Sequence, residues 1–285
     1  MIGMDTPSGK IAVVTGATGG IGREIARGMA GMGMTVVIGA RSLERGEAAA
    51  REIANSSAVA PTAVTAMEVD VTDLASIRAF ASAVATRFGK LDVLVNNAGV
   101  WFTDRRETPS GVELTFATNV LGPHLLTELL LPTLRAGDHA RVVNMVSGFS
   151  GDYDVTDLQF RRRPFDGGKA YAQSKRALSL LTWGLAARTP ETGVTANAAE
   201  PGFVRTGFNR NASGFRASMI NFSARLFAVS PAKGADTPLW VATAPELAGV
   251  TGQRFAARKV KPDAFRDPAE IAPLEQACLA LERGA

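Results

Sequence analysis

Tyr171 and Lys175 are the two residues whose types and spacing most clearly suggest chemistry. Residues four apart on a helix share one face, about one turn from each other. An ammonium about 4 Å from a phenol favours the phenolate by up to roughly 4 kcal/mol at an effective dielectric constant of about 20. That lowers a phenol pKa of about 10 by at most about three units, and such a tyrosine can exchange a proton with an alcohol or a carbonyl. The pair alone is weak evidence, because a Tyr and a Lys on one helix face usually have no joint function.

A glycine-rich turn near the N-terminus supplies the second indication. It reads Thr15-Gly16-Ala17-Thr18-Gly19-Gly20-Ile21-Gly22, after an apolar run at 11–14 that predicts a buried strand and before a helical pattern over 21–29. Strand, glycine turn and helix in this order are typical of a dinucleotide-binding loop, whose helix N-terminus faces phosphates. Gly16 permits the tight turn, Gly20 lets the backbone approach a pyrophosphate, and Gly22 lets the helix pack on the sheet. The alternative is a plain turn between strand and helix.

The elements that must position these residues alternate along the chain. The predicted strands are 11–15, 35–39, 64–69, 91–96, 141–147, 194–198 and a short seventh at 253–256. Helices are predicted between them, such as 73–88, 111–134 and 168–189, and Pro123 is expected to kink the second. The alternation predicts an α/β fold: a single-domain, doubly wound Rossmann fold with a parallel seven-stranded sheet and helices on both faces.

Further motifs extend the pattern over nearly the whole chain. Asn96-Asn97-Ala98-Gly99 follows the fourth strand, Asn119 precedes Gly122, Ser147 ends a strand, and Pro201-Gly202 precedes Val204 and Thr206. Together with the glycine turn and the Tyr–Lys pair, these motifs resemble the short-chain dehydrogenase/reductase family. The insert between Ser147 and Tyr171 and the run Gln173-Ser174-Lys175 resemble the branch that contains retinol dehydrogenases and protochlorophyllide reductase.

The resemblance implies four catalytic residues. Tyr171 would donate the proton in ketone reduction, and Lys175 would lower its pKa and hold the nicotinamide ribose. Ser147 would hydrogen-bond the substrate carbonyl and stabilise the developing alkoxide. Asn119 would hold a water and the helix bend. The structural alternatives are a strand-end cap for Ser147 and a partner for the helix kink for Asn119.

The resemblance also implies a nicotinamide cofactor, which would supply the hydride. The residues expected to bind it are Gly16, Thr18, Gly20, Ile21, Gly22, Arg41, Ser42, Asp70, Val71, Asn97, Ala98, Gly99, Tyr171, Lys175, Pro201, Gly202, Val204 and Thr206. Asp70 corresponds to a family residue that contacts the adenine, and its alternative is capping of the next helix.

The end of the second strand predicts NADP(H) rather than NAD(H). No carboxylate stands there to accept from a ribose 2′-hydroxyl, whereas Arg41 can pair with a 2′-phosphate and Ser42 can add a hydroxyl. A charge-assisted hydrogen bond is worth about 1.5–3 kcal/mol, or roughly a 10- to 100-fold preference.

Composition excludes several other classes of function. Cys278 is the one cysteine, and the two histidines stand apart, so no disulfide within the chain and no metal site are predicted. No apolar run of 18 or more residues suggests a membrane span, and residues 1–10 lack the apolar core of a secretory signal, so a cytoplasmic protein is expected. The net charge of +4 does not require nucleic acid as a partner. The basic run Arg161-Arg162-Arg163 is expected to be a solvated loop, with a basic rim at the active-site mouth as the alternative.

The partner is expected to be a small-molecule substrate with a bulky apolar or aromatic group. Residues 1–285 are predicted to form a single NADP-binding domain with a substrate lid at about 203–230 and a C-terminal extension at about 259–285. Phenylalanines and other apolar residues dominate the expected lid, although a membrane-surface helix is the alternative. The other side of the pocket is expected to include Trp101, Phe102, Phe149 and Tyr153, whose alternative is core packing. Glu200 stands where the family has His, Asn or Cys, and would reach the nicotinamide side of the site or face solvent.

These observations predict an NADPH-dependent carbonyl reductase (ketoreductase) or alcohol dehydrogenase acting on a bulky apolar or aromatic ketone or alcohol, in secondary metabolism. The family resemblance implies a homodimer or homotetramer assembled through the helices at 111–134 and 168–189. Two alternatives remain open. One is a non-catalytic NADP-binding regulator. The other uses the same machinery for C=C or C=N reduction, epimerisation or dehydration, because fold alone does not decide the reaction.

Overall fold

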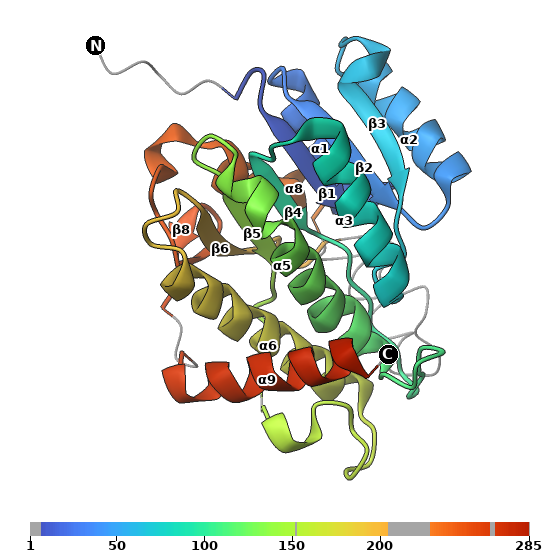
Figure 1. Cartoon of the computed structure of the whole chain (residues 1–285), viewed down its shortest axis with the longest axis vertical. Coiled ribbons are helices and arrows are strands. Elements are labelled where there is room, and N and C mark those ends of the chain that lie inside the picture. The colour runs from blue at the N-terminus through green and yellow to red at the C-terminus, as the bar shows by residue number, and fades with distance from the viewer. Residues whose placement is uncertain (1–6, 152, 205–228, 263–265, 285) are drawn as a thin grey trace.

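The computed structural model describes residues 7–151, 153–204, 229–262 and 266–284. A central sheet of eight strands forms its middle layer, in the order β3-β2-β1-β4-β5-β6-β7-β8 (Figure 1). The strands are β1 (Ile11–Thr15), β2 (Thr35–Ala40), β3 (Val64–Glu68), β4 (Val93–Asn96), β5 (Arg141–Met145), β6 (Thr195–Glu200), β7 (Arg254–Ala256) and β8 (Lys259–Val260). The seven predicted strands and the doubly wound α/β fold are therefore confirmed.

The eighth strand was not predicted. It pairs with β7 in the antiparallel sense, whereas the first seven strands run parallel. Ala257 and Arg258 join the two strands, and both have a positive φ, as the two central residues of a tight hairpin turn require. Neither residue is the Gly or Asn that signals such a turn, and a strand of two residues is too short to show an alternating pattern.

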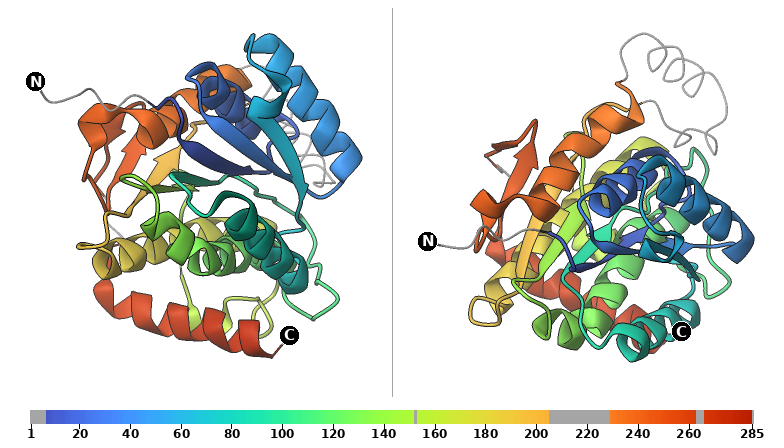
Figure 2. Two further views of the ribbon diagram at one scale, coloured as in Figure 1. Left: turned by 45° about the horizontal axis from the view of Figure 1, so that its top comes forward. Right: turned by 90° about the horizontal axis from the view of Figure 1, so that it is seen from above.

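Helices cover both faces of the sheet (Figure 2). The helices α1 (Gly20–Gly31), α2 (Leu43–Ser56) and α8 (Pro231–Thr243) share one apolar core with the sheet. The helices α3 (Leu74–Phe88), α5 (Gly122–Arg135) and α6 (Gly167–Arg188) form the other layer, where α3, α5 and the C-terminal part of α6 share the second core. The C-terminal helix α9 (Pro268–Arg283) lies outside this second layer, along α6.

The sheet order reverses between β1 and β4, because β1 lies beside β2 on one side and β4 on the other. In an open parallel sheet a ligand binds outside the carboxyl ends of the strands at such a reversal. The glycine turn follows β1, Asn97 follows β4, Ser147 follows β5 and Pro201 follows β6. The topology therefore brings the expected site residues to one edge of the sheet.

The helix predicted at 111–134 is divided. A short helical turn α4 (Leu114–Phe116) leads into a wide turn at Ala117–Leu121, in which the Gly122 N–H donates to the carbonyl five residues back. Helix α5 begins at Gly122, with Pro123 in its first turn. Pro123 has no N–H to give to the carbonyl of Asn119, which explains why regular α-helix is interrupted here. A side chain at Gly122 would overlap the carbonyl of Val71, so this glycine lets the bent segment approach the sheet.

Candidate active site

Ser147, Tyr171 and Lys175 converge at the carboxyl edge of the sheet. Tyr171 and Lys175 lie on α6, whose first turn is capped by Asp166, and Ser147 lies two residues beyond β5. The Tyr171 hydroxyl is hydrogen-bonded to the Ser147 side chain. Lys175 Nζ donates to the carbonyl of Met145 at 2.8 Å and lies 5.6 Å from the centre of the Tyr171 ring. The structure thus brings together three of the four expected catalytic residues through direct contacts.

Burial controls the protonation of this pair. It raises the pKa of Tyr171 to about 12, although the hydrogen bond with Ser147 acts in the opposite direction. Burial also lowers the pKa of Lys175 to about 8. From the sequence, Lys175 was expected to lower the pKa of Tyr171. In the structure, burial outweighs the hydrogen bond with Ser147, so Tyr171 keeps its proton at neutral pH and can act as an acid.

Asn119, the fourth expected catalytic residue, lies fully buried in the wide turn before α5. Its Oδ1 accepts from the Val100 N–H at 2.8 Å, and its Nδ2 donates to the Val100 carbonyl at 3.0 Å and to Ser174 Oγ at 3.0 Å. A Cβ placed on Gly99 would lie 3.5 Å from both Asn119 Oδ1 and Lys175 Nζ. Asn119 therefore joins the loop after β4 to α6 close to the lysine. Its side-chain bonds go to Val100 and Ser174 and not to the backbone of the kink, so they do not match its structural alternative.

The glycine turn presents an uncapped helix N-terminus to this edge. No side chain caps α1, and its first turn carries no acidic residue, so its N–H groups and positive dipole end are available to an anion. Gly16 has a positive φ, and its N–H donates to the carbonyl of Gly39 at 3.0 Å. A side chain at Gly22 would overlap the Asn97 amide and crowd the Gly16 carbonyl. The turn is therefore held in a shape that glycine alone permits.

Asn97 and Ala98 hold this turn from β4. The Asn97 Nδ2 donates to the carbonyl of Thr15 at 2.8 Å, and the N–H groups of Asn97 and Ala98 donate to Thr15 Oγ1 at 3.0 and 3.1 Å. Two of the expected cofactor residues thus act, in this structure, as supports of the glycine turn.

The turn after β6 lies against the glycine turn. Gly202 has a positive φ. A Cβ placed on Gly234 of α8 would contact both Val204 and Ile21, so these two side chains adjoin the same point. Thr206 and most of the expected lid, residues 205–228, lie outside the described residues.

The residues expected near the adenosine half lie at the ends of β2 and β3. Arg41 is exposed and forms no ion pair with any residue that the structure describes. Ser42 caps α2 by accepting from the Arg45 N–H, so its hydroxyl is already engaged. Asp70 Oδ1 accepts from the N–H and hydroxyl of Thr72 at 2.9 and 2.7 Å. The cap of α3 is Asp73 rather than Asp70, which excludes the capping alternative for Asp70. Val71 is buried, with Gly122 packed against its carbonyl.

Phe149 is the one expected pocket aromatic that contacts a catalytic residue among those described. Its ring stacks on Tyr171 with centroids 6.4 Å apart, and its side chain is 63% exposed. Trp101 and Phe102 are buried, and Tyr153 packs against the core under α6 with an Arg176 guanidinium over its ring. Core packing, the alternative, describes these three.

The basic run at 161–163 serves the insert before α6. Arg161 donates to the carbonyl of Gly111, and Arg163 pairs with Asp157 at 3.1 Å and donates to Gln173. These contacts tie the insert to the segment before α4, to itself and to α6. Arg161 and Arg163 are thus tethers of the loop, and Arg162 is exposed.

Glu200 does not face solvent, which was one of its two expected arrangements. It forms an ion pair with Arg254 of β7, and its side chain is 11% exposed. Arg254 was not singled out from the sequence, because its only signal was a charged residue within a predicted strand.

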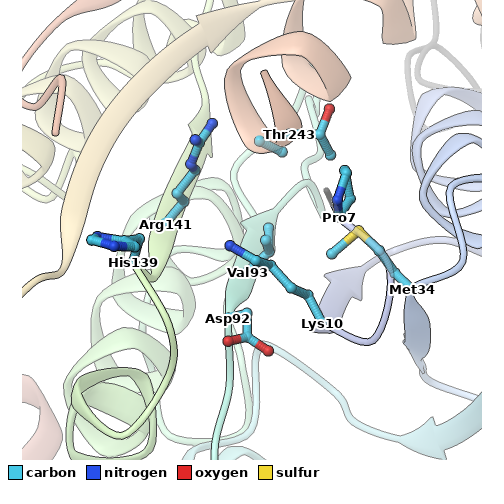
Figure 3. Close-up of a pocket in the computed structure, with 9 residues that line it drawn as sticks. Pro7, Lys10, Met34, Asp92, Val93, His139, Arg141 and Thr243 are labelled. Carbon is cyan, nitrogen blue, oxygen red and sulfur yellow. The ribbon is translucent and has the colours of Figure 1, made fainter. Parts of the chain in front are cut away.

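A small cavity at the other edge of the sheet is not part of this site (Figure 3). It is lined by Lys10, Asp92, Val93 and Arg141, which precede or begin the parallel strands. Asp92 accepts from the N–H groups of Ile11 and Asp138 at 2.7 and 2.8 Å, and Arg141 donates to the carbonyls of Val241 and Ala244 at the end of α8. Asp92 and Arg141, two of the charged side chains that line this cavity, thus hydrogen-bond backbone groups. Within the described residues no cluster could hold a metal ion, and none of the helices there is both long and apolar enough to cross a membrane.

Comparison with known proteins identifies relatives over nearly the whole chain. The family described as short chain dehydrogenase matches residues 10–216. Human retinol dehydrogenase 13 is 36% identical over 262 residues, which cover 90% of this chain and 78% of that protein. Mouse polyprenol dehydrogenase is 39% identical over 274 residues, which cover 93% of this chain and 78% of that protein.

Solved structures also superpose on nearly the whole chain. An uncharacterized protein from Mycobacterium paratuberculosis superposes with a TM-score of 0.77 at 30% identity, covering 99% of this chain and 96% of that one. The Pseudomonas aeruginosa RhlG/NADP complex superposes with a TM-score of 0.69 at 27% identity, covering 90% of this chain and 97% of that one.

Proposed function

We propose that this chain, which belongs to the short-chain dehydrogenase/reductase family and to its retinol dehydrogenase-like branch, is an NADP(H)-dependent carbonyl reductase or alcohol dehydrogenase. The observation that carries the proposal is the contact of Tyr171 with Ser147 at the edge where the glycine turn presents a bare helix N-terminus. Oxidoreductase chemistry with a nicotinamide cofactor follows from the family. The choice of NADP(H) and of the carbonyl direction is the proposal.

The residues fit the cofactor that the family implies. The uncapped N-terminus of α1 suits a pyrophosphate, and exposed Arg41 suits a 2′-phosphate. The Pseudomonas relative is described as an NADP complex. Gly202, Val204 and Ile21 would form the wall beside the nicotinamide. When bound, the nicotinamide supplies or accepts the hydride.

The protein's own groups handle the proton and the oxygen. Tyr171 holds its proton, since burial raises its pKa to about 12, and would give it to the carbonyl oxygen of the substrate. Ser147 would donate to the same oxygen and stabilise the negative charge that develops on it. Lys175, fixed through the Met145 carbonyl, would hold the nicotinamide ribose and supply positive charge beside Tyr171. Asn119 would fix the loop after β4 and the lysine relative to each other.

The proposed substrate is a bulky apolar aldehyde, ketone or alcohol. Exposed Phe149 presents an aromatic face next to Tyr171. This face favours a substrate that has an apolar group next to its reacting carbon. The relatives are described as dehydrogenases of retinol and of polyprenol, both isoprenoid alcohols. Among bulky apolar compounds we therefore favour an isoprenoid aldehyde or alcohol, with an aromatic ketone of secondary metabolism as the second choice.

The test is NADPH oxidation, followed by absorbance, over a panel of retinal, long-chain isoprenoid aldehydes, aromatic ketones, quinones and a short water-soluble aldehyde. The parent is expected to turn over the bulky members, and Tyr171→Phe is expected to lose about 100-fold or more in rate while NADPH still binds. Turnover that survives in Tyr171→Phe would contradict the proton-donor role. NADPH binding with no reduction across the panel would replace the proposal by the non-catalytic regulator, or by action on C=C or C=N bonds, epimerisation or dehydration.

The assembly and location stay predictions. A homodimer or homotetramer through the helices at 111–134 and 168–189 would need a free outer face on α6, and α9 lies along that face (Figure 2). We therefore propose that an assembly of two or four copies uses another surface. Cytoplasmic residence, expected from the sequence, is checked by cell fractionation.

A further inference from the structure

A nearly buried ion pair joins two strand ends beside the candidate active site. Glu200 ends β6 and Arg254 begins β7. Arg254 Nε donates to Glu200 Oε1 at 2.6 Å, and the two side chains are 12% and 11% exposed. Neither residue has a part in the hydride or proton transfer proposed above. Removing two charges from water is costly, so a pair in this position calls for an explanation.

The register of the sheet places the two side chains together. Ala198 pairs with Arg254, and Glu200 pairs with Ala256. Residues two apart on a strand share a face, so Glu200 and Arg254 are diagonal neighbours on one face, within reach of long side chains. Ala198 packs with Leu178 of α6 on that face. The ion pair therefore lies on the same side of the sheet as the helix that carries Tyr171 and Lys175.

Arg254 uses its second nitrogen to hold the catalytic segment. Its Nη2 donates to the carbonyl of Ser147 at 3.3 Å. Strand β6 lies between β5 and β7, so the side chain reaches over one strand to a residue that follows the next. The Val146 N–H still donates to the carbonyl of Ala199 at 3.0 Å, as a continuation of the sheet. The Ser147 carbonyl comes after that bond and is held by a side chain.

Glu200 also lies against the turn that follows Ser147. A Cβ placed on Gly148 would lie 2.9 Å from Glu200 Oε2, so the carboxylate lies directly against that turn. Because Arg254 is fixed by Glu200, its planar guanidinium presents Nη2 to the Ser147 carbonyl in one orientation. A lysine at this position would have one nitrogen for both acceptors.

We propose that Glu200 and Arg254 are positioning residues, which set the backbone of Ser147 so that its hydroxyl faces Tyr171 and the substrate oxygen. This inference rests on the proposed function, since Ser147 must act in catalysis for its position to matter. A displacement of about 1 Å in a catalytic group can cost up to about 100-fold in rate.

The experiment compares Arg254→Met, Arg254→Lys and the double variant Glu200→Gln/Arg254→Met with the parent, on the best substrate of the panel. Arg258→Met is the matched control. Arg258 lies in the turn between β7 and β8, forms an exposed ion pair with Asp236 of α8, and makes no contact with Ser147 among the described residues. Each protein is measured for thermal midpoint, NADPH dissociation constant, kcat and KM.

Arg254→Met is expected to lower kcat by about 10- to 100-fold and to lower the thermal midpoint, with the NADPH dissociation constant within about twofold of the parent. The double variant is expected to regain thermal midpoint, because no unpaired charge remains buried, and to keep the low kcat. Arg254→Lys is expected to keep the ion pair and lose kcat. Arg258→Met is expected to match the parent in kcat.

A double variant whose kcat returns together with its thermal midpoint would overturn the positioning role and leave a structural ion pair. An Arg254→Met variant with the parent's kcat would do the same. In both cases the parent remains active, and the proposed function stands. An inactive parent would instead overturn the proposed function and this inference with it.

Discussion

Lys175 donates from Nζ to the carbonyl oxygen of Met145, 2.8 Å away, and so ties the helix of Tyr171 to the strand that leads to Ser147. The lysine is 4% exposed. Its backbone partner is neutral, so among the residues that the structure describes no carboxylate offsets the hydration that the buried ammonium loses.

That burial gives the free energy of unfolding a pH dependence. Burial lowers the pKa of Lys175 to about 8 in the folded protein, whereas an unfolded lysine titrates at about 10.4. Between these values the unfolded chain binds more protons than the folded one, so stability rises with pH. Relative to Lys175→Met, the parent is expected to gain about 1.5 kcal/mol between pH 8 and 9.5, measured by urea unfolding. In the control Lys169→Met, which removes an exposed lysine of the same helix, the gain should remain. An equal pH profile for the parent and Lys175→Met would contradict the buried charge.

Arg41 is expected to set the preference for NADPH over NADH. Arg41→Ala removes the cation proposed for the 2′-phosphate, and it should reduce the ratio of the two dissociation constants by about 10- to 100-fold. The affinity for NADH should stay nearly constant, because that cofactor has no 2′-phosphate. Arg51→Ala is the control, since Arg51 is an exposed arginine further along α2. Fluorescence titration measures the dissociation constants of NADPH and NADH for all three proteins. An unchanged ratio in Arg41→Ala would move the 2′-phosphate site elsewhere.

Phe149 is expected to select for bulky apolar substrates. Its ring stacks on Tyr171 and is 63% exposed, so a substrate could cover it. Phe149→Ala should raise KM by up to about 10-fold for isoprenoid or aromatic substrates, since covering part of a Phe side chain is worth about 1 kcal/mol or more. KM for the short aldehyde should stay near the parent value. Leu43→Ala, which truncates an exposed apolar residue on α2, should leave both values unchanged. A uniform change across substrates would indicate that Tyr171 has lost the support of the Phe149 ring instead.

The residues that could be predicted from the sequence stand at the ends of elements that the sequence also predicts. Ser147 follows a strongly apolar strand, and Tyr171 and Lys175 are one turn apart on one helix, so local patterns are sufficient to place them. Arg254 could not be found in this way. Its contact with Ser147 depends on the register of β6 against β7 and on the order of three strands, which no local pattern contains.

The C-terminal helix shows a different cause of omission. Asp267 caps α9 and Pro268 occupies its first turn, which are recognised helix-start signals. Leu274 and Cys278 follow at a helical spacing and are fully buried. The residues expected only as a C-terminal extension therefore carried evidence for a helix, and what they lacked was any indication of the surface on which it packs.

Gly22 is expected to be required for the shape of the glycine turn. A methyl group there would overlap the Asn97 amide and crowd the Gly16 carbonyl. Gly22→Ala should therefore lower the free energy of unfolding by about 1–3 kcal/mol and weaken NADPH binding by about tenfold or more. Gly19→Ala is the matched control within the same turn, because no atom lies within 4 Å of its added Cβ and its backbone is extended. It should retain the parent's stability. Tight NADPH binding by Gly22→Ala would show that the turn adapts to the larger residue.

Helix α9 is expected to keep the full chain from associating through α6. Leu274 and Cys278 fill its inner face. Two ion pairs, Arg176–Glu270 at 2.7 Å and Arg188–Glu275 at 3.3 Å, and a hydrogen bond between His124 and Glu282 at 2.7 Å join it to the neighbouring helices. A second copy could reach α6 only by displacing this helix. Light scattering is therefore expected to show an assembly of 29.9-kDa chains that does not depend on the release of α9 from α6. Glu270→Lys, which reverses one of these charges, should lower the thermal midpoint without raising the mass, and Glu47→Lys on α2 serves as the exposed control. If a dimer or tetramer forms and amide exchange is slowed on α9 itself, the copies meet on the outside of this helix. If the mass rises in Glu270→Lys, α9 competes with a second copy for α6, which would contradict this prediction.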